Sequence, residues 1–421
     1  MTIISTITNL IRICAIVSII LSISGQAIGS KTTWTAGAGG STDWFLASNW
    51  DNGVPTMADS AIITGGTNSL NVLILINSNA EALHITLDQH CILTILTAGI
   101  VLDVFSPENV IRINENAQLI NYGVVSYGVT NTAFTGDGIL VLGRMDNYGT
   151  IITDNSFSRN SIKVGANGTL INYGLNALAG IKGIINIAGL PPPDTLNGNG
   201  IHVLGLLENQ GDISTNYTNI GIFFGDNANG INSGEIKVQN SKNGLVCNGN
   251  SFVTNELDGT IDIIDSENGL GNQDSAIFTN NGDLFLTRLR FLGLFNSATF
   301  INNNSLKISG IESGSASYGI LNQNLSSNTP HFENNMQIRM CDIKSTAIEL
   351  KNSTTFINNG LVDVSDINGV TKNGLIVKPQ ANFSITENGS LHLPLTFNIP
   401  LDIHLGGVFN VDKGGILDIK N

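Results

Sequence analysis

Charged residues are scarce in this chain, and basic residues are the scarcest. Asp, Glu, Lys and Arg make up 12% of its 421 residues, against roughly a quarter in an average soluble domain. The 19 basic and 33 acidic residues give a formal net charge of −14. Binding to nucleic acid requires a basic footprint, and docking on an anionic membrane requires a basic patch. The charge balance therefore argues against both partners.

Proline and helix-forming stretches are also rare. The chain has 9 Pro but 47 Gly, and it lacks long amphipathic stretches of Leu, Glu, Lys and Ala. Gly and Asn tolerate the positive φ angles of tight turns, so abundant Asn-Gly without Pro indicates many short strands joined by tight turns. The composition therefore predicts an all-β protein with little helix.

Residues 1–30 have the character of an export signal. Arg12 is the only charge in this segment, an apolar run extends from Ile13 to Leu21, and small residues follow up to Ala27. An apolar run of this length beside small residues is typical of a cleavable signal peptide rather than a membrane span. We therefore expect a signal peptide over residues 1–30 and an exported bacterial protein, extracellular or on the cell surface, with no membrane span in the mature chain.

Cysteines are few once the signal is removed. Cys14 lies in the signal, so Cys91, Cys247 and Cys341 remain. Their odd number and wide separation fit neither a disulfide framework nor a metal-ligand cluster. We interpret them as small buried residues, and the sequence leaves open whether two of them pair.

A short phrase recurs through the second half of the chain. It consists of a Phe, an Asn two residues later, and then a run that alternates apolar and polar residues; its Phe residues at 278, 300, 332 and 356 are 22, 32 and 24 residues apart. Asn-Tyr-Gly at 121–123, 147–149 and 172–174 is an earlier relative, and a second phrase of Asn-Gly-Leu or Asn-Gly-Ile type lies between the copies. Such a period is typical of a solenoid, in which each repeat buries its face against its neighbours. We predict a right-handed parallel β-helix, similar to the pectate-lyase-like solenoids, with about a dozen coils of 22–26 residues over residues 68–421.

Stacked coils assign roles to the repeated residues. Asn side chains at equivalent positions are expected to hydrogen-bond along the rod, as in the amide ladders of stacked sheets. An interior aromatic stack is expected from five residues, Phe252, Phe278, Phe300, Phe332 and Phe356. The Pro-rich segment near 189–194 stretches one repeat and is expected to form a surface loop, because prolines do not fit a paired strand.

The segment from Trp34 to Ile62 differs from the repeats and contains all three Trp of the protein. Its residues follow the order W-x-G, D-W, N-W, G-x-P and D-x-A-x-I, in which the three Trp are Trp34, Trp44 and Trp50. This order resembles the segment that opens many bacterial secreted and autotransporter-like β-solenoid surface proteins, and the Asn-Gly repeats that follow resemble theirs. The resemblance implies a surface or secreted protein, often one with a role in adhesion.

We interpret residues 31–67 as the N-terminal cap of the solenoid. The first coil has an open end that needs a cover, and Trp is large enough to provide one. The alternative is a sugar-stacking platform made by Trp34, Trp44 and Trp50. Arg288 and Arg290 are interpreted as salt-bridged surface residues, with a site for a carbohydrate carboxylate as the alternative.

The sequence contains no recognisable catalytic constellation. Parallel β-helices often host polysaccharide lyases and glycoside hydrolases, which need paired carboxylates or an acidic calcium site with a base. The nearest approaches are Asp262 with Asp265 and Asp363 with Asp366, and a spacing of three places the two carboxylates on opposite faces of a regular strand. The six His are scattered. We therefore predict no catalytic residue, no cofactor and no metal site.

Two functions remain for such a chain. The first is a non-catalytic secreted or cell-surface solenoid with an adhesive or structural role, whose partners are surface glycans or other extracellular proteins. The second is a carbohydrate-active β-helix enzyme, a polysaccharide lyase or glycoside hydrolase. The last residues, 406–421, are still repeat-like, so we also expect an open last coil that is able to join another molecule end to end.

Overall fold

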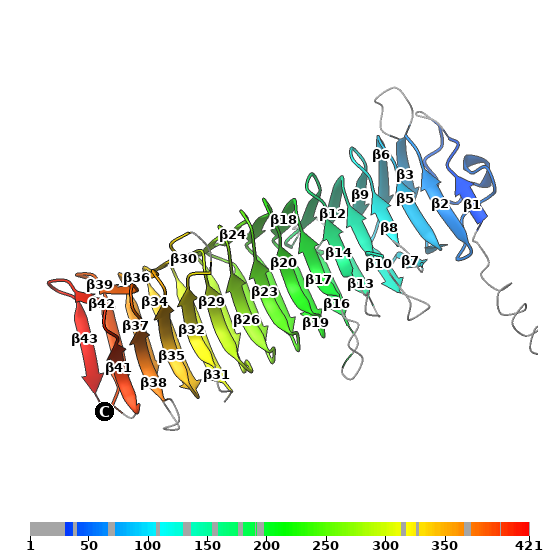
Figure 1. Cartoon of the computed structure of the whole chain (residues 1–421). Coiled ribbons are helices and arrows are strands. Elements are labelled where there is room, and N and C mark those ends of the chain that lie inside the picture. Colours follow the sequence, from blue (N-terminus) through cyan, green and yellow to red (C-terminus); the bar gives the residue numbers. More distant parts are fainter. Residues whose placement is uncertain are drawn as a thin grey trace, which may run out of the picture.

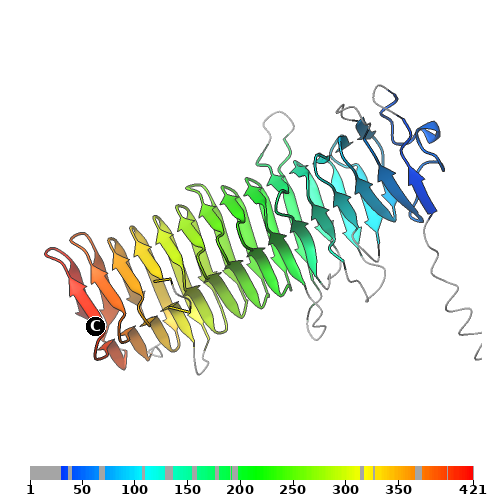
Figure 2. The same cartoon turned by 45° about the horizontal axis from the view of Figure 1, so that its top comes forward.

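Short parallel strands wind into a long rod, together with one turn of 3-10 helix, η1 (Ala47–Asn49) (Figures 1 and 2). The computed structural model describes residues 30–36, 40–65, 72–106, 110–128, 136–153, 159–175, 180–189, 191, 198–312, 317–325, 328–365, 372–395 and 397–420. The predicted signal peptide lies outside this part of the chain, except for Ser30. Within the described residues, no helix has the length and apolar character needed to cross a bilayer.

From β2 onward every third strand belongs to the same sheet, so each coil gives one strand to each of three parallel sheets; β1 adds a further strand beside β2. Sheet 1 contains β1 (Ser30–Thr33), β2 (Asp59–Ile63), β5 (His84–Leu87), β8 (Ile111–Ile113), β11 (Ile139–Val141), β14 (Asn160–Val164), β17 (Asn199–Val203), β20 (Ile220–Phe224), β23 (Asn243–Cys247), β26 (Asn268–Asn272), β29 (Leu292–Asn296), β32 (Tyr318–Gln323), β35 (Thr346–Lys351), β38 (Asn373–Val377) and β41 (Ile399–Ile403). Sheet 2 contains β3 (Val72–Ile76), β6 (Cys91–Ile95), β9 (Gln118–Asn121), β12 (Arg144–Asn147), β15 (Thr169–Asn172), β18 (Leu206–Asn209), β21 (Asn229–Asn232), β24 (Phe252–Asn255), β27 (Ile277–Asn280), β30 (Thr299–Asn302), β33 (His331–Asn334), β36 (Thr355–Asn358), β39 (Asn382–Ile385) and β42 (Val408–Val411). Sheet 3 contains β4 (Ala80–Ala82), β7 (Val101–Phe105), β10 (Val124–Gly128), β13 (Thr150–Thr153), β16 (Ile184–Ala188), β19 (Asp212–Asn216), β22 (Glu235–Gln239), β25 (Thr260–Ile264), β28 (Asp283–Thr287), β31 (Ser305–Ile311), β34 (Gln337–Ile343), β37 (Leu361–Ser365), β40 (Ser390–Pro394) and β43 (Ile416–Lys420).

The predicted parallel β-helix is confirmed, but its coils are more numerous and less uniform than expected. The three sheets hold 15, 14 and 14 strands, so the rod has more turns than the predicted dozen. Aligned residues in successive coils are 21 apart from Ile201 to Ile222 and 39 apart from Ile162 to Ile201. The long coil contains the Pro-rich segment, of which residues 190 and 192–197 lie outside the described part of the chain.

The first Asn of each repeated phrase forms a buried ladder inside sheet 2. Each side-chain Nδ2 except that of the last member, Asn358, donates to the Oδ1 of the equivalent Asn in the next coil, at 2.7–2.9 Å. The ladder members are Asn121, Asn147, Asn172, Asn209, Asn232, Asn255, Asn280, Asn302, Asn334 and Asn358. The Asn ladder that the sequence predicts is therefore present, and it satisfies a buried row of polar groups that would otherwise be costly.

A second row of amides lies on the outer surface of the rod, one residue after the buried ladder in the same coils. Asn303 donates to Asn281, Asn335 to Asn303, and Asn359 to Asn335, at 2.7–2.8 Å. Asn303 is exposed, whereas Asn302 beside it is fully buried. The Asn-Asn pair of the phrase thus supplies one interior and one exterior rung per coil.

The Phe residues of the phrase stack in the core beside the buried Asn ladder. Ring centroids of successive members are 4.3–5.6 Å apart, and the stack extends further than predicted, to Phe383 and Phe409. Four of the five predicted members, Phe278, Phe300, Phe332 and Phe356, are fully buried.

The prediction for Phe252 was wrong. Phe252 is 52% exposed, and Val253 occupies the inward position that aligns with Phe278. In the true phrase the Phe lies two residues before the ladder Asn, whereas Phe252 lies three residues before Asn255. A shift of one residue moves a side chain to the other face of a strand, so Phe252 points to solvent.

The second phrase, Asn-Gly-Leu or Asn-Gly-Ile, forms the start of sheet 1 strands. A Cβ on Gly200 would lie 2.5 Å from the carbonyl oxygen of Gly221 in the next coil, and a Cβ on Gly221 would lie 2.6 Å from that of Gly244. Backbones approach too closely there for a side chain. The recurring Gly therefore has a steric cause within the rod.

The two ends of the described rod differ. β1 and β2 already belong to sheet 1, and residues 42–44 extend the edge of sheet 2, where the Leu75 N–H donates to the Thr42 carbonyl at 2.8 Å. In the last coil, large apolar side chains are exposed: Ile399, Ile403, Leu405, Val408, Val411 and Ile416. The first coil is covered, and the last one presents its apolar residues.

Candidate functional site

A notch opens on the rod where three successive turns between sheet 1 and sheet 2 differ in length. The turns at 114–117 and 165–168 have four residues, whereas the turn between them, Leu142-Gly143, has two. Gly143 fits because its backbone lies against the preceding turn; a Cβ there would be 2.3 Å from the Asn114 carbonyl oxygen. The short middle turn therefore leaves a shallow hollow of about 490 Å³ between the two longer ones.

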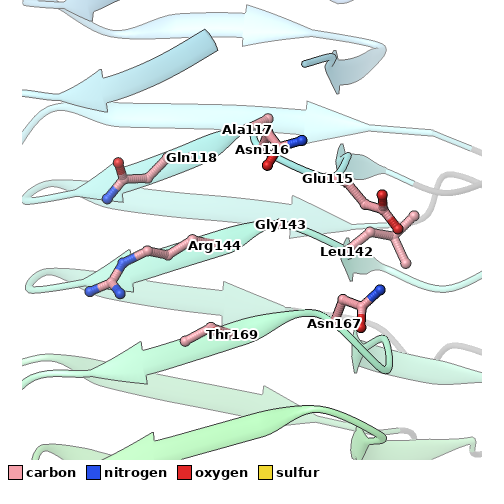
Figure 3. Close-up of a pocket in the computed structure, with 9 residues that line it drawn as sticks. All are labelled: Glu115, Asn116, Ala117, Gln118, Leu142, Gly143, Arg144, Asn167 and Thr169. Atoms are coloured by element: carbon pink, nitrogen blue, oxygen red, sulfur yellow. The ribbon is translucent and has the colours of Figure 1, made fainter. Parts of the chain in front are cut away.

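Polar side chains line this notch on both sides (Figure 3). Glu115, Leu142 and Asn167 lie on one side of Gly143, and Gln118, Arg144 and Thr169 lie on the other. Asn116 and Ala117 complete the lining. The exposed carboxylate and amide groups are suited to hydrogen bonds with a polar ligand such as a sugar.

Arg144 is held rigidly at the edge of the notch by a buried carboxylate. Its Nε donates to Asp146 Oδ2 at 2.8 Å, and its Nη2 donates to the Tyr173 hydroxyl at 3.1 Å. The Tyr173 hydroxyl in turn donates to Asp146 Oδ1 at 3.2 Å, and Gln118 donates to Asp146 Oδ2. The bond to Asp146 raises the pKa of Arg144. Because Asp146 is buried and Arg144 remains about half exposed, the guanidinium is oriented but still accessible.

Three tyrosines continue this surface beyond the strand ends. Tyr122, Tyr148 and Tyr173 stack face to face, with centroids 4.8 and 4.0 Å apart. Burial, followed by the contact with Tyr173, raises the pKa of Tyr148, and burial raises the pKa of Tyr122. We call the notch together with Gln118, Arg144, Asp146 and the three tyrosines the notch face. It combines fixed hydrogen-bonding groups with a column of stacked aromatic rings.

The three Trp form a packed cluster rather than an open platform. Trp34, Trp44 and Trp50 are at most 4% exposed, and Trp50 makes edge-to-face contacts with the other two at 5.0 and 4.9 Å. The indole N–H groups of Trp34 and Trp50 donate to the carbonyls of Ala36 and Trp44 at 2.7 Å. The cap interpretation stays a prediction that this packing fits, whereas rings buried to this extent offer no open face on which a sugar could stack.

Arg288 and Arg290 are paired with carboxylates of the preceding coil. Arg288 donates from Nε and Nη2 to the two oxygens of Asp265, at 2.7 and 2.6 Å, and Arg290 lies 3.4 Å from Glu267. Arg290 also lies over the ring of Phe291. Both side chains are exposed on the turns after sheet 3, as the salt-bridge interpretation predicts, and a carbohydrate-carboxylate site there is not supported because their charges are already matched.

Of the two carboxylate pairs considered in the sequence, only Asp262 with Asp265 lies wholly within the described residues. Asp262 points outward from β25, and Asp265 follows the strand in a left-handed conformation with φ of 54°. Both therefore lie on the outside, and the expected opposite faces do not apply because the strand ends at Ile264. Burial raises the pKa of Asp262, whereas the bond from Arg288 lowers that of Asp265. Asp366 lies outside the described residues.

One further polar cluster lies on the outer face of sheet 1 near the end of the rod. Glu349, which is 5% exposed, lies 3.4 Å from the Lys351 ammonium and 3.9 Å from that of Lys378. Lys378 also lies 2.9 Å from His404 Nε2, which is 3.1 Å from Asp402. Two lysines facing two carboxylates neutralise each other, so the cluster is an ion-pair network. Nowhere in the described residues do three or more His, Cys, Asp or Glu side chains meet in a way that would hold a metal ion.

The notch face was missed by the sequence search, although one signal for it was visible. Asn-Tyr-Gly recurs at spacings of 26 and 25 residues, which places the tyrosines in one column. Arg144 and Asp146 are two residues apart on a strand and therefore share a face. The turn-length difference that opens the notch depends on strand bounds that the sequence does not show.

Comparison with known protein families, with curated proteins and with solved structures finds no match for this chain.

Proposed function

We propose that this protein is an exported, non-catalytic β-solenoid that acts outside the cell or on its surface as an adhesive rod, with the notch face as its contact for glycans. The observation that carries the proposal is the oriented Arg144 beside an open polar notch and stacked tyrosines. The rod behind it supports this role because the Asn ladder, through Asn121, Asn147 and Asn172, links the coils that carry the notch face.

Glycan binding by the purified protein tests the proposal. Glu115→Ala combined with Asn167→Ala removes two exposed side chains that line the notch, and it is expected to weaken binding on a glycan array. Glu256→Ala combined with Asp258→Ala removes two carboxylates from a single later turn of the rod, between β24 and β25, and serves as the control. Equal binding by the notch variant and the wild type would contradict the assignment.

The same preparations address the enzyme alternative. The protein is incubated with uronate-containing and neutral polysaccharides, and new reducing ends or unsaturated products are measured. We expect none. Release of such products by the wild type would replace the adhesive proposal with a carbohydrate-active enzyme.

We further propose that copies of this chain associate through the last coil. Its exposed apolar side chains support this, since they cover one end of three sheets. Sedimentation should show a larger species whose share rises with concentration, and Val408→Asp with Ile416→Asp should abolish it. A single species at all concentrations would contradict the association.

A further inference from the structure

A second hollow lies on the outer face of sheet 1, at the start of β14 and β17. Its volume is about 420 Å³, and it is lined by Arg159, Asn160, Lys163, Gly198, Asn199, His202 and Asn219. Among the residues that the structure describes, two basic side chains and no carboxylate line it. This is unusual in a chain with 19 basic and 33 acidic residues.

The two basic groups in this hollow differ from other arginines of the described rod. Arg112, Arg144, Arg288 and Arg290 each donate to a side-chain acceptor. Arg159 and Lys163, by contrast, have no hydrogen-bond or ion-pair partner among the residues that the structure describes. Unpaired cations that share a concave surface attract an anionic group from solution.

A histidine and an aspartate lie near the two cations. Lys163 and His202 are register partners on adjacent strands. Burial, followed by the charge of Lys163, lowers the pKa of His202 and so favours the neutral imidazole. Asp137 does not line the hollow; it is buried and accepts a hydrogen bond from Asn160 at 2.6 Å.

The amides and rings beside the cations favour a saccharide over a peptide. Asn199 and Asn219 line the same hollow and supply donors and acceptors for hydroxyl groups. The His202 ring contacts Phe223 of the next coil edge to face, at 4.9 Å, which provides an apolar flank. We propose that this hollow binds the anionic group, a carboxylate or a sulfate, of an acidic polysaccharide, with Arg159 and Lys163 as its counter-charges.

This site shares no lining residue with the notch, which lies on the turns before sheet 2 and on the start of that sheet, so the two can be tested separately. Binding of the purified full chain to polygalacturonate, dextran sulfate, neutral dextran and poly-glutamate is measured by biolayer interferometry at low and moderate salt. We expect binding to polygalacturonate or dextran sulfate, weaker at higher salt, and none to dextran. Whichever of the two binds identifies the anion as carboxylate or sulfate.

Paired charge removals locate the site. Arg159→Ala with Lys163→Ala should raise Kd by about tenfold or more, whereas Lys237→Ala with Lys307→Ala, which removes two cations from the outer face of sheet 3, should leave Kd within about twofold. The notch variant Glu115→Ala with Asn167→Ala should also keep this binding. Unchanged thermal melting of the variants shows that the fold is retained.

Four outcomes would overturn the inference. They are absence of binding to both acidic polysaccharides, an unchanged Kd for the Arg159 and Lys163 variant, an equal loss in the Lys237 and Lys307 control, and binding to poly-glutamate as tight as to the polysaccharides. Loss of binding only in the notch variant would assign the acidic glycan to the notch face instead, which would leave the proposed adhesive function in place.

Discussion

Two neighbouring columns inside sheet 2 follow different rules. The amide column keeps Asn through ten consecutive coils, from Asn121 to Asn358. The column two residues earlier changes along the rod; its members are Leu119, Met145, Leu170, Leu207, Gly230, Val253, Phe278, Phe300, Phe332 and Phe356. Both columns are buried in the same strands, so burial alone does not explain the difference.

The difference lies in the directionality of the interactions. A buried amide needs a matched donor and acceptor in the coils before and after it, so changing one Asn leaves groups unsatisfied on both sides. Apolar packing needs only that the volume is filled, and a neighbour from another strand can fill it. Gly230 shows this, because the ring of Phe224 from sheet 1 occupies its place; a Cβ on Gly230 would be 2.5 Å from Phe224 Cε1.

The largest effect is expected in the middle of the Asn ladder. Asn209 accepts from Asn172 and donates to Asn232 Oδ1 and to the carbonyls of Gly211 and Glu235. Asn209→Leu should lower the free energy of unfolding by roughly 4–6 kcal/mol, since several buried polar groups lose their partners. Asn358→Leu, at the end of the ladder, should cost roughly half as much. Equal midpoints of urea denaturation for both variants would refute the explanation that each buried amide needs a matched donor and acceptor in both neighbouring coils.

The aromatic column should show a smaller, volume-dependent loss. Phe300→Ala creates a cavity between Phe278 and Phe332 and should cost about 3–5 kcal/mol. Phe252→Ala removes the same side chain from the outer face, and we expect a change within about 0.5 kcal/mol. Denaturation of both variants checks this, and similar losses would place Phe252 in the core.

Mutation can test whether the Phe224 side chain from sheet 1 fills the space beside Gly230 in sheet 2. Gly230→Ala should cost about 1–3 kcal/mol because the added methyl group meets the Phe224 ring. The double variant with Phe224→Leu should recover part of that loss, since the smaller side chain leaves room. Additive losses in the double-mutant cycle would show that the two positions do not share one space.

The smallest effect is expected in the exterior amide row. Asn303→Ala breaks the bonds to Asn281 and Asn335, but water replaces them at this exposed position. We expect a loss below about 1 kcal/mol, against several for Asn209→Leu. A loss as large as in the interior ladder would show that the amide bond itself, and not its burial, carries the stability.

The Phe and Asn columns of sheet 2 could be predicted from the sequence because the repeated phrase that marks them is short and local. The spacing of the repeats correctly aligned Phe278, Phe300, Phe332 and Phe356 in successive coils of sheet 2. The Asn two residues after each Phe identified the ladder positions. Phe252 was misplaced by one residue because its Val253 neighbour also fits a core position. The notch depended on the two-residue turn at Leu142-Gly143, and strand bounds cannot be located that closely from a pattern.

The sequence by itself determined the fold class, the three-strand coil and the interior columns, since alternation along a strand and repetition between coils both act over short distances in the chain. Only the tertiary structure decided which exterior groups meet. Lys163 and His202 are 39 residues apart and yet lie side by side, because the segment between β14 and β17 adds residues to the coil without changing the register of its strands. Which exterior side chains become neighbours therefore depends on the length of each coil and on how its strands align with those of the next coil. No single stretch of the sequence contains that information.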